Sequence, residues 1–424
     1  MVRNVSITDG GRWRGLAGCA VAVVVAAGAL SACGDESGVP VVNVYNAPQE
    51  NLGQIVDRCN EEADGAYRIV LNTLPRDADG QREQMVRRLA AADPGMDVLG
   101  IDVTWTAELA SAEWIRPWPK EYREEAEDGV LDAPLTTATF EDELFAAPSN
   151  TNVQLLWYRA DLMPEPAQTW DELIDVATDL AAEDQPHYVE VTGAQYEGLV
   201  VWFNSMVAAA DGSILNAAGD AVELGAPAVK ALEQMRNFAT SEAANPSLSN
   251  TQEDTARLAV ESGSSFAELN WPFVYASMVA NKPDIAENFR WAPYPGIDGP
   301  GRSPLGGANF AVSTYSEHPE QSFEAALCLR DPESQLWSAV NDGLPPTIES
   351  VYDEPEMADT YPMRDAILEA LKTAVPRPVT PVYQNVSTVT SAILSPPAAI
   401  QPRDDADRLA AAIRDALDSK GVLP

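Results

Sequence analysis

Hydrophobic runs alternate with amphipathic stretches between residues 39 and 101. The short apolar runs have the composition of strands, and the amphipathic stretches carry apolar residues at helical spacing. The predicted elements are, in order, a strand at Val39–Tyr45, a helix at Leu52–Glu62, a strand at Tyr67–Leu71, a helix at Gln81–Ala92 and a strand at Met96–Ile101. Such alternation predicts βαβ units and a parallel sheet. Because ligands bind beyond the carboxyl ends of parallel strands, we expect the loops that begin at Asn46, Asn72 and Asp102 to meet at one edge.

A second region begins with an apolar strand and continues with helices. The strand is predicted at Val153–Tyr158 and the first helix at Trp170–Ala182, where Thr169 is the N-cap and Glu172 completes a capping box. Further helices are predicted at Leu199–Ala210, Ala226–Thr240, Asp254–Glu261 and Asp404–Ser419. Two Pro- and Gly-rich breaks, which we interpret as crossings or hinges, are Tyr294–Gly307 and Asn341–Thr347.

The N-terminus has the pattern of an export signal. Arg3, Arg12 and Arg14 supply a positive segment, and Leu16–Leu30 is an apolar run too short to span a bilayer comfortably. The tetrapeptide Leu30-Ser31-Ala32-Cys33 resembles the bacterial lipobox, in which the signal peptide is cleaved before the cysteine and that cysteine is acylated. We therefore expect residues 1–32 to be a lipoprotein signal peptide and Cys33, followed by a tether over 33–39, to anchor the chain on the extracytoplasmic face of the cell membrane. The alternatives are a plain secretory signal and an uncleaved N-terminal helix.

Composition and charge narrow the classes of function. A mature chain of about 390 residues can form two or three lobes, and 46% hydrophobic residues are typical of a globular protein. The formal net charge of −38 argues against nucleic-acid binding, because phosphate recognition needs a basic face, and also against adhesion to anionic lipid. No other run approaches the ~18 apolar residues of a membrane span, so we expect only the lipid anchor to touch the bilayer.

Two cysteines remain for the mature fold. Cys19 lies in the signal and Cys33 is the expected lipid site, which leaves Cys59 and Cys328 as a pair in an oxidising compartment. They either form a disulfide or remain two buried free thiols.

The sequence lacks the common motifs of catalysis and metal binding. It contains no G-x-S-x-G elbow, P-loop, H-E-x-x-H, C-x-x-C or EF-hand loop. His187 and His318 are not at metal-ligand spacing, and we expect both at the surface. We therefore expect no catalytic residues, no cofactor and no metal. A glycosidase carboxylate pair stays open as an alternative, because its members need no proximity in sequence.

The loops at the predicted sheet edge carry groups that suit a sugar. Asn46, Gln49, Glu50 and Asn51 follow the first strand, and Asp102 follows the third. Planar acceptors and donors bind hydroxyl groups, and an aromatic face packs against the C–H side of a pyranose. The alternative role for Asn46, Asn51 and Asp102 is helix capping.

Several longer sequence segments resemble segments of the sugar-binding proteins of ABC importers. They are Phe145–Asn152 running into Leu155–Leu162, Glu197–Asn204, Asn270–Phe273, Gly306–Val312 and Arg377–Tyr383. In order and spacing they are most similar to the actinobacterial trehalose-binding lipoproteins of the LpqY type. The resemblance implies a two-lobed α/β fold of the periplasmic-binding-protein kind (type II), with three inter-lobe crossings near Pro148, Gly301 and Gly343. The implied lobes are residues 40–148 with 302–343, and residues 149–301 with 344–424.

The resemblance also implies which residues contact a sugar. The matching positions are Glu50, Asp102, Asn152, Trp271 and Arg377. Trp271 is expected to stack beneath a glucose ring, with a place in the core as the alternative. Arg377 is expected to donate to ring hydroxyls or to hold a carboxylate, with a purely structural inter-lobe ion pair as the alternative. Where an acidic contact is expected ahead of Ala256, this sequence offers Gln252 beside Glu253. The remaining candidates are Asn46, Asn51 and Gly307.

The implied function is the capture of a disaccharide, trehalose above all, by closure of the two lobes, and its delivery to an ABC permease with its ATPase subunits. We expect no covalent chemistry, no nucleic-acid partner, and a monomer when the protein is detached from the importer. The rival functions are a secreted glycoside hydrolase acting on a disaccharide and a lipid-anchored structural protein.

Overall fold

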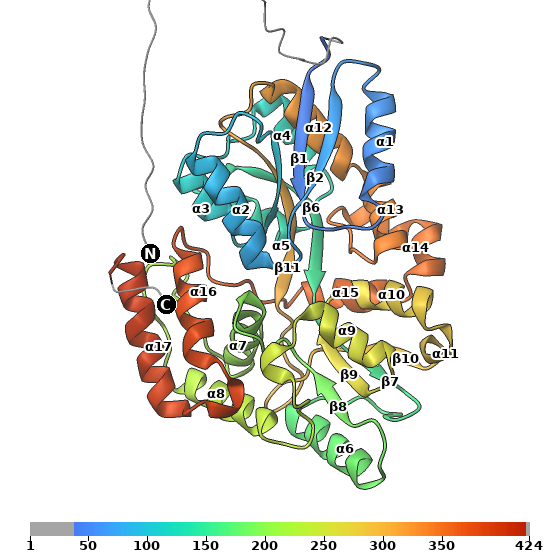
Figure 1. The fold of residues 1–424 in the computed structure, drawn as a ribbon, viewed down its shortest axis with the longest axis vertical. Helices are drawn as coiled ribbons and strands as arrows, with labels where there is room; N and C mark the ends of the chain where they lie inside the picture. Colours follow the sequence, from blue (N-terminus) through green and yellow to red (C-terminus); the bar gives the residue numbers. More distant parts are fainter. Residues whose placement is uncertain (1–37, 421–424) are drawn as a thin grey trace, which may run out of the picture. The chain divides into compact units, whose positions relative to one another are not determined.

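The computed structural model describes residues 38–420 (Figure 1). The predicted signal peptide, the lipid site at Cys33 and most of the tether lie outside the described residues. From Val39 onward the described chain forms one compact unit that contains two larger sheets. Within this part of the chain, no helix combines the length and the apolar character needed to cross a membrane.

The first lobe is built on a five-stranded sheet in the order β2-β1-β3-β11-β6. Its strands are β1 (Val41–Asn46), β2 (Arg68–Thr73), β3 (Val98–Asp102), β6 (Ala146–Val153) and β11 (Leu305–Val312). The first three strands are parallel, as the sequence predicts, whereas β11 runs antiparallel to both of its neighbours. The core against this sheet receives apolar faces from α1 (Leu52–Glu62), α2 (Ala78–Ala90) and α12 (Pro319–Arg330).

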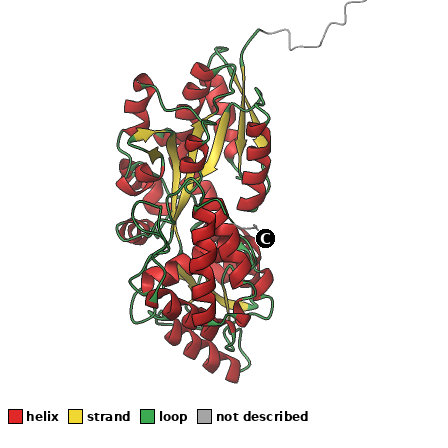
Figure 2. Cartoon of the chain, turned by 90° about the vertical axis from the view of Figure 1, so that its left-hand side faces the viewer, coloured by secondary structure: helices red, strands yellow, loops and turns green. Residues whose placement is uncertain are grey.

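The second lobe contains a four-stranded sheet in the order β10-β7-β9-β8. Its strands are β7 (Leu155–Arg159), β8 (Tyr188–Glu190), β9 (Ser265–Asn270) and β10 (Phe289–Ala292). Helices that pack into its core are α6 (Trp170–Ala182), α7 (Glu197–Ala209), α8 (Ala226–Ala239), α16 (Tyr383–Leu394) and α17 (Pro402–Leu417). The capping box of Thr169 and Glu172 is present at the start of α6, which confirms that prediction. In each lobe the strands lie inside and the helices outside (Figure 2).

A third hydrophobic cluster lies where the lobes join. It combines Val153 and Leu305, at the ends of β6 and β11, with residues of the helices that follow β9 and β11, such as Met278 and Ile367. The junction is therefore a packed core rather than a bare linker.

The remaining α-helices and strands are α3 (Thr106–Ser111), α4 (Lys120–Glu127), α5 (Asp132–Thr137), β4 (Thr139–Phe140), β5 (Glu143–Leu144), α9 (Glu253–Glu261), α10 (Phe273–Asn281), α11 (Pro283–Ala286), α13 (Pro332–Asp342), α14 (Pro355–Thr360) and α15 (Arg364–Leu371).

The chain passes between the lobes three times. β6 leads directly into β7, the loop after β10 leads back into β11, and the chain leaves α13 through Gly343, whose φ of 68° favours glycine. β6 and β11 pair from Leu305 opposite Val153 onward, with a bulge between Ala308 and Asn309. Two of the three crossings thus form one hydrogen-bonded ribbon.

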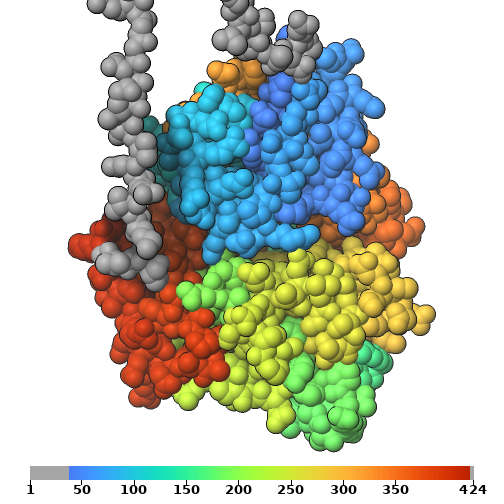
Figure 3. Space-filling model, viewed as in Figure 1, coloured from blue at the N-terminus to red at the C-terminus, as the bar shows by residue number. Residues whose placement is uncertain are grey.

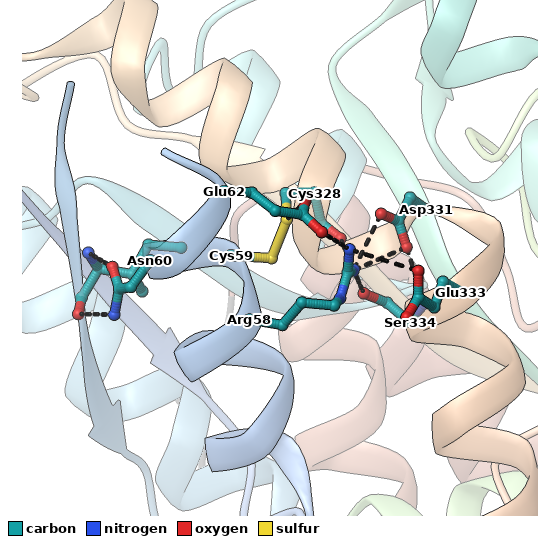
Figure 4. The surroundings of a disulfide bond; sticks show 9 residues. Arg58, Cys59, Asn60, Glu62, Cys328, Asp331, Glu333 and Ser334 are labelled. Carbon is teal, nitrogen blue, oxygen red and sulfur yellow. Dashed lines mark hydrogen bonds and ion pairs between the residues drawn. A yellow bond between two sulfur atoms is a disulfide. The ribbon is translucent and has the colours of Figure 1, made fainter. Parts of the chain in front are cut away.

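The structure joins Cys59 of α1 to Cys328 of α12 by a disulfide, which selects the bonded alternative for these cysteines (Figure 4). Beside it, Arg58 donates to Asp331 at 2.9 Å and to Ser334 at 2.6 Å. Both helices belong to the first lobe. The bond therefore links two helices of one lobe and does not join the lobes.

Candidate functional site

Arg377 connects the two lobes. It lies between α15 and α16, and its side chain is 3% exposed. Nη1 donates to Oε1 of Glu197 at 2.6 Å, in the first turn of α7, while Nη2 donates to Oδ1 of Asp102 at 3.0 Å, at the carboxyl end of β3. Asp102 belongs to the first lobe and Glu197 to the second. The guanidinium therefore holds one carboxylate from each lobe, an arrangement common to the carboxylate-holding role expected for Arg377 and to its ion-pair alternative.

Glu197 gathers further donors in a buried position. Its carboxylate accepts from Tyr383 at 2.6 Å and from the hydroxyl of Ser387, both on α16. Burial raises the pKa of Glu197, while Arg377 and these hydroxyl groups oppose the shift. Burial alone would lower the pKa of Arg377, but Asp102 and Glu197 raise it above its ordinary value. The guanidinium is therefore charged at every physiological pH.

Asp102 combines a local turn with the cross-lobe ion pair. Oδ1 accepts from the backbone and the hydroxyl of Thr104 at 2.9 and 2.7 Å, which forms a local turn. The N-cap residue of the next helix, α3, is Trp105, so Asp102 does not cap that helix. Nε of Arg377 is buried and has no hydrogen-bond partner in the described chain. Buried donors are rarely left unpaired in proteins, so this atom points to a water or a ligand at the lobe boundary.

Trp271 lies directly after β9, and its ring packs against Gly306 of β11. A Cβ atom on Gly306 would come within 2.8 Å of the ring atoms Cη2 and Cζ3, so only glycine leaves room for this ring. Asn152 of β6 is opposite Gly306 in the strand register, and its buried Oδ1 has no partner among residues 38–420. A partly exposed indole and an unsatisfied amide oxygen therefore lie together at the crossing ribbon. Gly307, with a φ of 130°, offers only backbone here, because a Cβ would meet the oxygen of Asn150 at 2.4 Å.

Glu253 comes from the second lobe, at the start of α9. Its carboxylate accepts from the hydroxyl of Tyr196 at 2.6 Å. Burial raises the pKa of Glu253, and hydrogen bonds from Tyr196 and the Trp271 side chain oppose this shift. The structure therefore places Glu253 beside Trp271. Gln252, the other candidate at this position, is the N-cap residue of α9.

The loop after β1 is held by α13 rather than left open. Asn51 donates through Nδ2 to Asp342 at 2.6 Å, and Gln49 donates to the same carboxylate at 2.9 Å. Asn51 is the N-cap residue of α1 but makes no side-chain capping bond. Asn46 is buried, and its Oδ1 occupies the space that a side chain on Gly100 would need. Of this loop, Glu50 stays exposed.

Two further contacts close the boundary between the lobes. Arg76, after β2, donates to Asp254 of α9 at 2.8 Å, and Gln384 of α16 donates to Asp79 of α2 at 3.3 Å. The space-filling view shows atoms of the two lobes in contact along this boundary (Figure 3). A surface hollow of about 560 Å³ between α8 and α17 is lined by none of the candidate residues.

Sequence reasoning missed Glu197, Tyr196 and Asp79 as members of this boundary. Glu197 had a usable signal, because it is the one carboxylate of an otherwise apolar helix segment, Glu197–Phe203. A charged residue that opens a buried helix needs a buried partner. Its partner, Arg377, lies 180 positions away, so the pairing itself has no local signature.

Comparison with known proteins finds a relative of similar sequence, structures of similar fold and a matching family model. A probable ABC transporter-binding protein of Deinococcus radiodurans is 27% identical over 368 residues, which are 82% of this chain and 86% of that protein. The fold is similar to maltose-bound MalE3 of T. maritima, with a TM-score of 0.82 and 24% identity, covering 89% of this chain and 99% of that one. An ABC transporter solute-binding protein of Thermotoga lettingae, bound with α-D-tagatose, gives a TM-score of 0.80 at 20% identity, over 89% of this chain and 100% of that one. Residues 51–335 match the family model for bacterial extracellular solute-binding proteins, and this chain belongs to that family.

Proposed function

We propose that this protein captures a sugar between its two lobes and delivers it to an ABC importer. The observation that carries this proposal is the cross-lobe pairing of Arg377 with Asp102 and Glu197, at a boundary that also holds buried polar atoms without a partner in the described chain. Trp271 supplies an aromatic face of the kind that packs against a pyranose. The ABC transporter-binding relative and the sugar-bound proteins of similar fold support the same reading.

Capture needs no covalent step. A sugar that contacts both lobes stabilises the closed arrangement by its differential contacts, and the closed form is then the one that the permease recognises. The protein is strongly acidic and a disaccharide is neutral, so hydrogen bonds and stacking supply the affinity. The glycoside-hydrolase alternative gains no support from the relatives.

We further propose that the sugar is a disaccharide, trehalose above all. This finer assignment rests on the sequence phrases that resemble trehalose-binding lipoproteins. Thermal shift with trehalose, maltose, sucrose and tagatose tests it, since a specific ligand raises the melting temperature by mass action. Trehalose should give the largest shift, and calorimetry should give a stoichiometry of one. A larger shift with maltose contradicts the trehalose assignment, and no shift with any sugar contradicts sugar capture.

Membrane attachment through Cys33 is a separate proposal. Acyl chains on this residue would keep the binding protein near its importer and raise its effective concentration there. Cys33→Ser should move the protein from the membrane fraction to the medium or the soluble fraction. Unchanged membrane association of that variant contradicts the anchor.

A further inference from the structure

Buried polar groups lie at the end of β9, directly before Trp271, the aromatic residue proposed to contact the sugar. Glu268 and Asn270 are both fully buried on this strand, and Trp271 follows directly. β7 and β8 flank the strand, and α9 packs against it. Burying a carboxyl and a carboxamide together costs free energy unless their hydrogen bonds are satisfied, so the partners of each group are informative.

The carboxamide of Asn270 holds two residues of the candidate site. Its Oδ1 accepts from the backbone N–H of Trp271 at 2.9 Å, and its Nδ2 donates to the backbone oxygen of Glu253 at 3.0 Å. Nδ2 also donates to Oε2 of Glu268 at 2.7 Å. Because one end of the amide only accepts and the other only donates, all three bonds form in a single orientation of the side chain.

Glu268, which accepts from the Asn270 carboxamide, has few donors around it. Its second oxygen, Oε1, is buried and unpartnered within residues 38–420. Glu190 of β8 is opposite Glu268 in the strand register. The carboxylate of Glu190 already accepts from Ser265 at 2.6 Å and Asn245 at 2.7 Å. Two carboxyl groups therefore lie side by side, and the side-chain donors that reach them within residues 38–420 are all neutral.

The other groups that face Glu268 give little compensation for a negative charge. From α9 come Arg257 and Glu261, but Arg257 is paired with Glu261 at 2.7 Å. The residue of β7 in register with Glu268 is Trp157, which does not titrate. Burial, with a contribution from Glu190, raises the pKa of Glu268 to about 8. Glu268 is therefore mostly protonated at pH 7.

We propose that Glu268 and Asn270 form a positioning pair for the sugar site, in which protonated Glu268 keeps the Asn270 carboxamide in the orientation that aligns Trp271 with Glu253. The inference rests on the proposed function, because it concerns the same sugar face. Neither residue of the pair contacts the sugar. Loss of the Glu268 proton strengthens the bond from Asn270 itself, but it places two negative charges side by side. As repulsion moves the Glu268 carboxylate away from Glu190, the Asn270 carboxamide bonded to it moves too, and its alignment with Trp271 and Glu253 is lost.

The experiment compares sugar affinity with pH in the full mature protein. Calorimetry with trehalose between pH 6 and pH 9.5 should show the wild-type affinity falling at least fivefold above pH 8. Glu268→Gln keeps the shape of the neutral acid and cannot ionise, so its affinity should stay level over this range. Asp405→Asn removes another buried carboxylate of the second lobe, and it should keep the wild-type pH dependence. A wild-type pH dependence in Glu268→Gln overturns the proposal.

A second measurement needs no sugar. With ¹⁵N-tryptophan labelling, the backbone amide signal of Trp271 is identified by its loss in Trp271→Phe. In wild type this signal should titrate with a midpoint near pH 8, it should not titrate in Glu268→Gln, and Glu190→Gln should lower the midpoint because it removes the neighbouring charge. A titrating amide without sugar binding contradicts the proposed function and leaves the pair supported. If sugar binds but the Trp271 amide signal does not change with pH, the positioning role of Glu268 and Asn270 is contradicted and the proposed function stays supported.

Discussion

Arg377 lies 3.0 Å from Asp102, and this ion pair joins a loop near the end of the chain to the carboxyl end of a strand in the other lobe. Asp102→Asn keeps an acceptor for Thr104 but removes the charge that faces the buried guanidinium. We expect sugar affinity to fall by about 2 kcal/mol, because the buried guanidinium of Arg377 loses its charged partner in the first lobe. Calorimetry measures this loss.

The matched control for that variant is Asp254→Asn. Asp254 pairs with Arg76 across the same boundary, but Arg76 is 75% exposed. Exposed pairs contribute at most about 1 kcal/mol, so affinity should change little. Equal losses in the two variants would contradict a special role for the Arg377 pair.

Trp271→Ala should weaken sugar binding on the order of 1 to 3 kcal/mol through the loss of an apolar stacking face. Trp337→Ala, which removes an exposed tryptophan of α13, is the control and should bind as wild type does. Calorimetric affinity is the measurement. Unchanged affinity in Trp271→Ala would remove this residue from the binding site.

Gly306→Ala tests the place of the Trp271 ring without changing the ring itself. The added methyl group would lie 2.8 Å from the indole, so the ring must move. We expect weaker sugar binding together with a destabilisation of about 1 to 3 kcal/mol from overpacking. In Gly299→Ala the methyl group meets open space, so both quantities should stay at the wild-type value.

The buried acid Glu268 predicts how stability depends on pH. Its pKa rises from 4.5 to about 8 on folding, so between these values the native state holds a proton that the unfolded chain has lost. The free energy of unfolding should therefore fall as pH rises through this window, by up to about 1.4 kcal/mol per pH unit for this group. Urea denaturation at several pH values should show a smaller slope in Glu268→Gln. An identical slope in that variant contradicts the assignment.

The disulfide should stabilise the first lobe without affecting recognition. It joins residues 269 positions apart, and a loop of this length predicts a loss of about 5 to 6 kcal/mol in unfolding free energy for the double variant Cys59→Ser and Cys328→Ser. Both residues lie outside the lobe boundary, so sugar affinity should be retained at temperatures where the variant is folded. Denaturation with and without reductant measures the first effect. A loss of affinity in the folded variant would show that the bond also shapes the site.

Helices with a clear amphipathic face were predictable from the sequence. Leu52–Glu62 and Trp170–Ala182 have the predicted bounds, because apolar spacing marks one helix and a capping box marks the start of the other. The two-lobed α/β fold followed from the resemblance of several sequence segments to those of ABC-importer sugar-binding proteins. Local patterns do not specify which distant segments share a sheet.

Strand β9 had no such signal. It is buried along its whole length, yet it carries Glu268 and Asn270, so it shows neither the alternation of a surface strand nor the uniform apolar run of a core strand. The roles of individual site residues were limited in the same way. Asn46 has a suitable side chain at a suitable strand end, but the absence of a side chain on Gly100 lets it turn inward.

The ribbon formed by β6 and β11 determines how the lobes can move. A pair of hydrogen-bonded strands bends readily across its flat face and resists shear along its length. With Gly343 as the third connection, the second lobe should therefore rotate relative to the first about a single hinge axis. Trp271 packs on this ribbon at Gly306. A sugar bound against Trp271 would therefore also press on the ribbon, and the angle between the lobes would depend on the size of the sugar.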